Sequence, residues 1–206
     1  MTGRAMTRRV TARRPLAAVV IMIVSALVVS ACSGPPDSTS GEGDGRVSAL
    51  LVEHDLVGLD AAQVIERLDT MPVADRPADL MASVRPDELV LSNGDGVETS
   101  LPMPRDEVYV SVAPYVEQTH ECHFHSLTTC LGELTGAEVE VELVGEDGRV
   151  LIEETRATFD NGFVGLWVPR GIRATLTIRQ GERTATAEVS TRDDQDPTCL
   201  TTMRLT

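Results

Sequence analysis

Hydrophobic residues recur at every second position through much of the chain after residue 106. The alternation is clear at Val108, Val110 and Val112, and again across residues 139–143. This period of two is that of a β-strand with one buried face. Several short strands joined by close turns are typical of a β-sandwich. The pattern therefore predicts an antiparallel β-sandwich over 106–206, with further strands at 150–152, 163–168, 172–178, 184–189 and 199–205.

The preceding segment has a different pattern, in which helical spacing alternates with strand-like runs. Apolar residues recur at helical spacing over 48–57, and Asp60 is placed to cap a helix over 61–71 that buries Val64, Ile65 and Leu68. Pro72 ends this helix. Residues 79–84 are expected to form a short helical turn. The runs 88–92 and 97–101 flank Asn-Gly-Asp-Gly, which predicts a hairpin. Residues 47–105 thus form a small mixed α/β unit, and the fold class is α+β.

The N-terminal stretch has the features of an export signal. Five arginines precede an apolar run from Leu16 to Val29, which ends in Val-Ser-Ala-Cys. The run is short for a membrane span, which needs about 20 apolar residues. We predict a signal peptide over 1–31, acylation of Cys32, and a polar, flexible tether over 32–46. An extracytoplasmic lipoprotein of the cell envelope, held to the membrane by its lipid, follows from these features.

Charge excludes one class of partner. Residues 1–31 hold five of the 18 basic residues and no acid, so 13 bases remain against 32 acids. A chain this acidic does not bind nucleic acid through its net field. Only 3% of the residues are aromatic, which also argues against a stacking-based site.

Candidate chemistry is concentrated in one short segment. His120, His123 and His125 lie within six residues around Cys122, and Cys130 follows eight residues after it. In a strand, His120 and Cys122 would share a face; in a helical turn, Cys122 and His125 would meet. Folding could also bring Cys199 to this cluster. Thiolates beside imidazoles form a metal-ligand set by composition.

Two other interpretations of these residues remain open. Exported cysteines usually form disulfides, here Cys122–Cys130 or Cys130–Cys199, and the histidines could belong to a solvated loop. With Cys32 acylated, however, one thiol is left over. Among metals, zinc is usual for mixed Cys/His sites, but its cysteines commonly lie two to four residues apart. Copper is the rival, because thiolates suit Cu(I) and imidazoles also accept Cu(II).

Three motifs resemble the CueP family of periplasmic copper-binding proteins. They are the run from Ala113 to Leu134, the run from Asp160 to Arg170, and Asp196-Pro-Thr-Cys-Leu-Thr-Thr-Met203. The family pattern has two cysteines eight apart and a third near the C-terminus, which Cys122, Cys130 and Cys199 match one by one. The resemblance implies copper resistance in the envelope, with these cysteines as ligands or redox thiols.

Further expectations also come from the resemblance. It implies reduction of Cu(II) to Cu(I) and a supply of copper to exported superoxide dismutase. Because such reduction converts the thiol ligands into a disulfide, a thiol-disulfide reductant that restores the cysteines is also expected. Metal binding is expected as the primary role, and a homodimer is left open. The histidines as ligands are an inference from spacing. The alternatives are a thiol-disulfide redox protein and a disulfide-stapled structural or adhesion sandwich without metal.

Overall fold

The computed structural model describes residues 39–206. The signal peptide predicted over 1–31, the acylated Cys32 and the first part of the tether lie outside the described residues. Helix α1, Thr39–Glu53, begins before the helix expected at residue 48 and so takes in the end of the segment expected as tether. No helix within 39–206 is long and apolar enough to cross a membrane.

Helix α2, Ala61–Asp69, follows from its local sequence as predicted. The Asp60 carboxylate accepts a hydrogen bond from the Gln63 backbone N–H at 2.9 Å, and the Gln63 side chain accepts one from the Asp60 N–H at 3.0 Å. This reciprocal capping box satisfies two N–H groups that the helix leaves unpaired. The face formed by Val64, Ile65 and Leu68 is buried. A single 3₁₀ turn, η1 (Val73–Asp75), follows Pro72.

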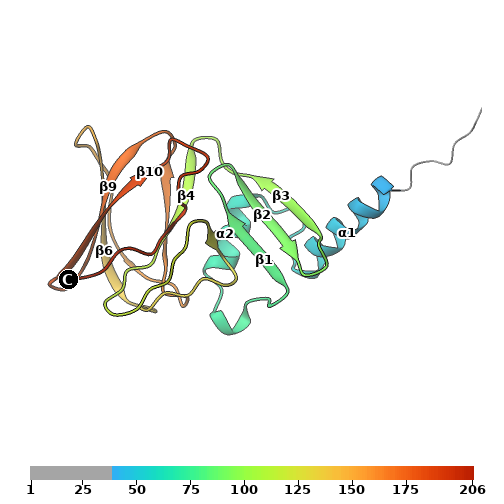
Figure 1. Ribbon diagram of the computed structural model, residues 1–206, viewed down its shortest axis with the longest axis horizontal. Coiled ribbons are helices and arrows are strands. Elements are labelled where there is room, and N and C mark those ends of the chain that lie inside the picture. The colour runs from blue at the N-terminus through green and yellow to red at the C-terminus, as the bar shows by residue number, and fades with distance from the viewer. Residues whose placement is uncertain (1–38) are drawn as a thin grey trace, which may run out of the picture. The chain divides into compact units, whose positions relative to one another are not determined.

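The first sheet has the strand order β3-β2-β1-β5. The predicted hairpin is confirmed by β2, Glu88–Asn93, paired antiparallel with β3, Glu98–Pro102. The helical turn expected over 79–84 is wrong: these residues form strand β1, Leu80–Val84, paired antiparallel with β2. Leu80, Ala82 and Val84 alternate on the buried side of this strand, next to α2 (Figure 1). Burial along these residues has a period of two, as in a strand, although an apolar run this short also fits helical spacing.

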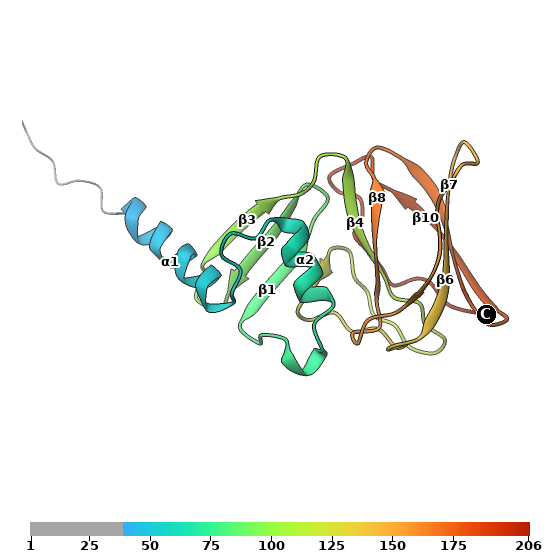
Figure 2. The same ribbon diagram turned by 180° about the vertical axis from the view of Figure 1, so that it is seen from behind.

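Two further sheets enclose the second core, in the sandwich-like arrangement that the alternation predicted (Figures 1 and 2). One sheet has the order β10-β9-β6-β7 and the other β11-β4-β8. Their strands are β4 (Glu107–Val112), β6 (Glu138–Gly145), β7 (Val150–Ala157), β8 (Val164–Pro169), β9 (Arg173–Gln180), β10 (Arg183–Ser190) and β11 (Cys199–Leu200). The last strand is shorter than the expected 199–205 and runs parallel to β4.

Strand β4 is buried on both sides, although its sequence alternates. Val108, Val110 and Val112 face the core of the sandwich, as predicted. Tyr109 belongs instead to the core beneath α2, and its ring lies 4.9 Å from that of Trp167 on β8. Strand β5, His125–Ser126, comes from the later segment but completes the first sheet beside β1. The first sheet therefore takes strands from both sides of the boundary expected at residue 105, and the described residues belong to one compact unit.

Candidate metal centre

The fold brings Cys122, Cys130 and Cys199 together, although Cys199 is distant from the other two in sequence. Cys122 and Cys130 lie on the long connection between β4 and β6, and Cys199 begins β11. The Sγ atoms of Cys122 and Cys130 are 3.5 Å apart. A disulfide needs about 2.05 Å, and all three cysteines are free thiols. The disulfides considered from the sequence are therefore not formed here.

Backbone hydrogen bonds hold the connection against β11. The His123 carbonyl accepts the N–H groups of Thr198 at 3.0 Å and of Cys199 at 3.1 Å. The Cys130 N–H donates to the Ser126 carbonyl at 3.1 Å, while the Ser126 N–H points at the Cys130 sulfur at 3.4 Å. The first pair of bonds joins the connection to the start of β11, and the second pair closes the turn between Ser126 and Cys130. The thiols therefore meet through main-chain geometry rather than through long, flexible side chains.

Two glycines allow the connection to pack against the turn before β8. A Cβ on Gly132 would lie 2.6 Å from the Gly162 carbonyl oxygen, and one on Gly162 would lie 2.6 Å from the Gly132 backbone. Gly162 also has a φ of +79°, which side chains rarely adopt. The Gly132 N–H donates to the Asn161 carbonyl at 2.6 Å. This close approach places the segment after Cys130 directly beside the Asp-Asn-Gly turn.

Two of the three predicted histidines join the thiols. His125, Cys130 and Cys199 present ligand atoms within 4.8 Å of one another, and so do His120, Cys122 and Cys130. Cys130 is common to both groups. His125 is fully buried, with its Nδ1 3.7 Å from the Cys199 sulfur. The Nε2 of His120 is buried and has no hydrogen-bond partner.

The structure does not bring His123 into either group. Its ring turns away along the loop, where Nε2 lies 2.9 Å from the Gln195 carbonyl oxygen. His123 contributes to the site through its backbone carbonyl, which accepts the Cys199 N–H, and not through its imidazole. The chain bends at His123 and Phe124, so the His123 ring points away from the thiols although His125, two residues later, faces them.

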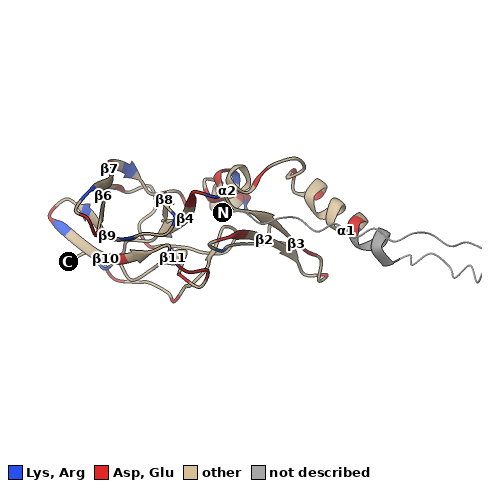
Figure 3. Ribbon diagram, turned by 90° about the horizontal axis from the view of Figure 1, so that it is seen from above, with Lys and Arg blue, Asp and Glu red and all other residues tan. Residues whose placement is uncertain are grey.

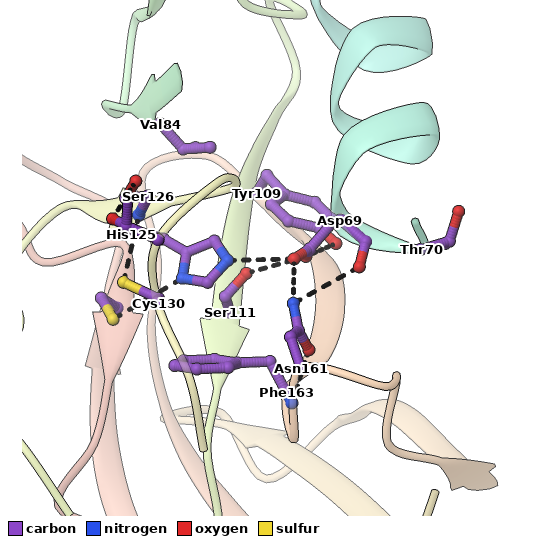
Figure 4. A network of polar contacts seen from close by, with 12 residues as sticks. Asp69, Thr70, Val84, Tyr109, Ser111, His125, Ser126, Cys130, Asn161 and Phe163 are labelled. Atoms are coloured by element: carbon purple, nitrogen blue, oxygen red, sulfur yellow. Dashed lines mark hydrogen bonds and ion pairs between the residues drawn. The ribbon is translucent and has the colours of Figure 1, made fainter. Parts of the chain in front are cut away.

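Sequence reasoning missed Asp69, the last residue of α2. Its carboxylate is fully buried and lies 3.0 Å from His125 Nε2. The Tyr109 hydroxyl and the Asn161 amide also donate to it, each at 2.7 Å, as Figure 4 shows. The one available signal was an acidic residue at the end of the apolar stripe of α2, and that signal is weak because helix ends are commonly solvated.

The electrostatics of the thiols favour one thiolate at the centre. Hydrogen bonds from the Cys122 thiol and then from the Cys199 thiol are the main causes that lower the pKa of Cys130 far below the ordinary value of a thiol. The hydrogen bond to Cys130 raises the pKa of Cys122 to about 12. The pKa of Cys199 is also raised, by its hydrogen bonds to Cys122 and Cys130. Cys130 is thus the thiol that ionises first.

Arg76 adds positive charge on the outer side of Cys130. Its Nη1 donates to the Cys130 carbonyl at 2.9 Å, while Nε and Nη2 are buried and unpartnered. Burial lowers the pKa of Arg76, and the negative charges of Asp69, Cys130 and Asp160 oppose that shift. The positive charge of Arg76 therefore interacts favourably with a thiolate at Cys130.

The comparisons with known proteins identify the family of this chain. The family model described as "Periplasmic copper-binding protein CueP" matches residues 63–204. The chain belongs to the CueP family. A solved CueP structure, "Crystal Structure of S.CueP", has a TM-score of 0.71 and 34% identity, covering 77% of this chain and 96% of that one. No curated protein matches the chain.

Membership of the CueP family agrees with the three motifs that first indicated it. All three lie within the matched range, and they supply Cys122, Cys130, Cys199 and the turn at Asn161. The match begins at Gln63, inside α2, so the helix that carries Asp69 belongs to the CueP region as well.

Proposed function

We propose that this protein binds copper outside the cytoplasm through Cys122, Cys130 and Cys199, assisted by His125 and His120. The observation that carries the proposal is the convergence of three free thiols and two imidazoles around Cys130. Thiolates are the preferred ligands of Cu(I), and imidazoles accept both oxidation states. The buried, unpartnered Nε2 of His120 supports the fit, because a buried donor atom without a partner is costly unless a ligand engages it.

The same thiols are proposed to reduce Cu(II). Two Cu(II) ions each accept one electron, Cys122 and Cys130 lose two protons and form a disulfide, and two Cu(I) ions result. The 3.5 Å between these sulfurs supports the pairing, since a small movement closes the bond. The lowered pKa of Cys130 supplies the thiolate. A thiol-disulfide reductant must then restore the thiols, and Cys199 remains free to hold Cu(I).

Two parts of the proposal rest on the sequence and the family rather than on the site geometry. The Val-Ser-Ala-Cys sequence at the end of the apolar run supports anchoring through an acylated Cys32. The resemblance supports a supply of copper to an exported superoxide dismutase. Zinc remains the competing metal for the same ligands.

The deciding experiment is an anaerobic titration of the reduced protein with Cu(II), on a Cys32→Ser background so that three thiols are counted. We expect two thiols to disappear as two equivalents of Cu(I) form, measured with a thiol reagent and a Cu(I)-specific chromophore. Cys130→Ser should abolish both signals. Thr128→Val, which removes a buried hydroxyl without a partner, is the matched control. Persistence of the thiols with unreduced Cu(II), or a preference for zinc, would contradict the proposal.

A second candidate is a thiol-disulfide redox protein without a metal role. It is favoured by the close Cys122–Cys130 pair and by the partial exposure of Cys122. It predicts exchange with a small disulfide at the same rate with and without copper. The copper proposal predicts instead that Cu(I) slows exchange, because the metal occupies the thiols. The rate of mixed-disulfide formation with and without one equivalent of Cu(I) separates the two functions.

A further inference from the structure

A buried carboxylate stands behind the copper ligands, at a position that helix physics disfavours. Asp69 ends α2, where the helix dipole is negative and an acidic side chain is least stable. Its side chain has no exposed surface. Burying a charge costs free energy unless the charge is fully hydrogen-bonded. An acid in this place therefore needs a reason beyond the stability of the helix.

The hydrogen bonds to Asp69 come from three separate parts of the fold. Oδ1 lies 3.0 Å from His125 Nε2 and accepts the Asn161 amide at 2.7 Å. Oδ2 accepts the Tyr109 hydroxyl at 2.7 Å and that of Ser111 at 3.4 Å. Figure 4 shows the carboxylate at the centre of these donors, with the Cys130 sulfur on the other side of the imidazole. The carboxylate links α2, β4 and the Asp-Asn-Gly turn to β5.

The contact with His125 determines which nitrogen carries the proton. An ionised carboxylate only accepts hydrogen bonds, so Nε2 must be the N–H nitrogen of His125. In the neutral ring, Nδ1 is then the nitrogen with the free lone pair. That atom lies 3.7 Å from the Cys199 sulfur, and His125 forms one group of potential metal ligands with Cys199 and Cys130. The lone pair thus faces the space that the thiols enclose.

We infer that Asp69 is the positioning residue of the copper centre, which holds His125 in the Nε2–H tautomer so that Nδ1 is its metal-binding atom. The inference rests on the proposed copper function and extends it to the N-terminal unit, which carries Asp69. A carboxylate behind a metal-binding histidine fixes the ring and makes it a better donor, and loss of such a partner typically costs about 10- to 100-fold in metal affinity.

Packing around the imidazole prevents the opposite orientation. The fully buried Phe163 ring lies with its centroid 4.6 Å from that of His125. The His125 N–H donates to the Thr198 hydroxyl at 3.0 Å, which in turn donates to the Val84 carbonyl at 2.6 Å. The backbone and one ring face of His125 are therefore both fixed. Ligation through Nε2 would require the loss of the Asp69 contact and a rotation against Phe163.

The first test reads the tautomer in the metal-free protein. Long-range ¹H–¹⁵N correlation spectra of the reduced full chain, recorded over a pH series, report which nitrogen of neutral His125 is protonated. We expect Nε2–H in the wild type. Finding Nδ1–H would overturn the inference. Because no copper is present, this result does not depend on the proposed copper function.

The second test uses Asp69→Asn, which keeps the shape and removes the charge, with retained folding checked by the amide spectrum. Its Cu(I) affinity, measured by competition with a chromophoric chelator, should fall about 10- to 100-fold. Asp160→Asn is the control, because Asp160 is also tied into the fold, through the Val73 N–H at 2.7 Å, but does not contact His125. Wild-type affinity in folded Asp69→Asn would overturn the inference.

The two tests also separate this inference from the proposed function. If the variant does not fold, the wild-type tautomer still decides the question of positioning. If His125 carries the proton on Nε2 but the wild type binds no copper, the copper function fails while the Asp69–His125 arrangement stands. If copper binds tightly in the wild type and His125 carries the proton on Nδ1, the function stands and the positioning role fails.

Discussion

A Cβ on Gly165 would occupy the position of the Tyr109 hydroxyl group. Gly165 on β8 is paired with Ser111 on β4, two residues after Tyr109. The Tyr109 ring therefore reaches diagonally over β8 and lies against Gly165. The absence of a side chain at Gly165 therefore opens the path by which this hydroxyl reaches Asp69, 2.7 Å away.

Gly165→Ala should consequently destabilise the protein and disturb the buried network. Tyr109 is only 5% exposed and packs against Trp167, so its ring has little room to move. We expect a loss of about 1–3 kcal/mol in the free energy of unfolding, as for overpacked cores. Denaturant unfolding checks it. Gly94→Ala is the control, because a Cβ there meets nothing within 4 Å; equal losses in both variants would contradict the steric argument.

Thr198 joins three segments through one hydroxyl. It accepts the His125 N–H and donates to the Val84 carbonyl. Thr198→Val keeps the shape but leaves a buried N–H and carbonyl without this partner, which should cost about 1–3 kcal/mol. Chemical unfolding of the metal-free protein measures the loss. Thr128→Val should be near neutral, because that buried hydroxyl has no partner to lose.

Glu133 should make the stability of the loop before the cysteines depend on pH. Backbone N–H groups of Gln118, Glu117 and Val116 donate to its carboxylate and lower its pKa. A depressed pKa contributes stability above the unfolded value, about 4.3, and that contribution disappears as the pH falls through the folded value. Wild type and Glu133→Gln should therefore differ in unfolding midpoint at neutral pH and converge in acid. Glu182→Gln, in the exposed β9–β10 turn, should have the same unfolding midpoint as the wild type at both pH values.

Arg76 should strengthen copper binding by charge. A Cu(I) ion held by three thiolates carries two net negative charges, and the half-buried guanidinium of Arg76 near Cys130 stabilises them. Arg76→Gln should weaken Cu(I) binding about fivefold, the effect of a charge interaction near 1 kcal/mol. Chelator competition measures it. Arg204→Gln serves as the control, since Arg204 likewise donates to a loop carbonyl, that of Val116. An unchanged affinity in Arg76→Gln would rule out the electrostatic role.

The acidity of the chain has no single structural focus. Figure 3 shows Asp and Glu spread over the described helices, strands and loops. The thiols, by contrast, are gathered in one place and are largely shielded from solvent. Net charge therefore carried no information about where the metal ligands meet.

Local chemistry alone determined several elements. The capping box before α2, the Asn-Gly-Asp-Gly hairpin and the alternating strands of the sandwich depend on residues a few positions apart, so they could be predicted from the sequence. The helical turn expected over 79–84 was wrong because a five-residue apolar run fits either period, and only pairing with β2 decides for a strand.

The candidate site divides in the same way. The grouping of cysteines and histidines between residues 120 and 130 is visible in the sequence, because these ligands are neighbours in the chain. Tertiary structure alone decided that His123 turns away, that Cys199 returns beside Cys130, and that Asp69 stands behind His125. Those relationships depend on backbone direction and on contacts between residues more than 50 positions apart, which no local pattern encodes.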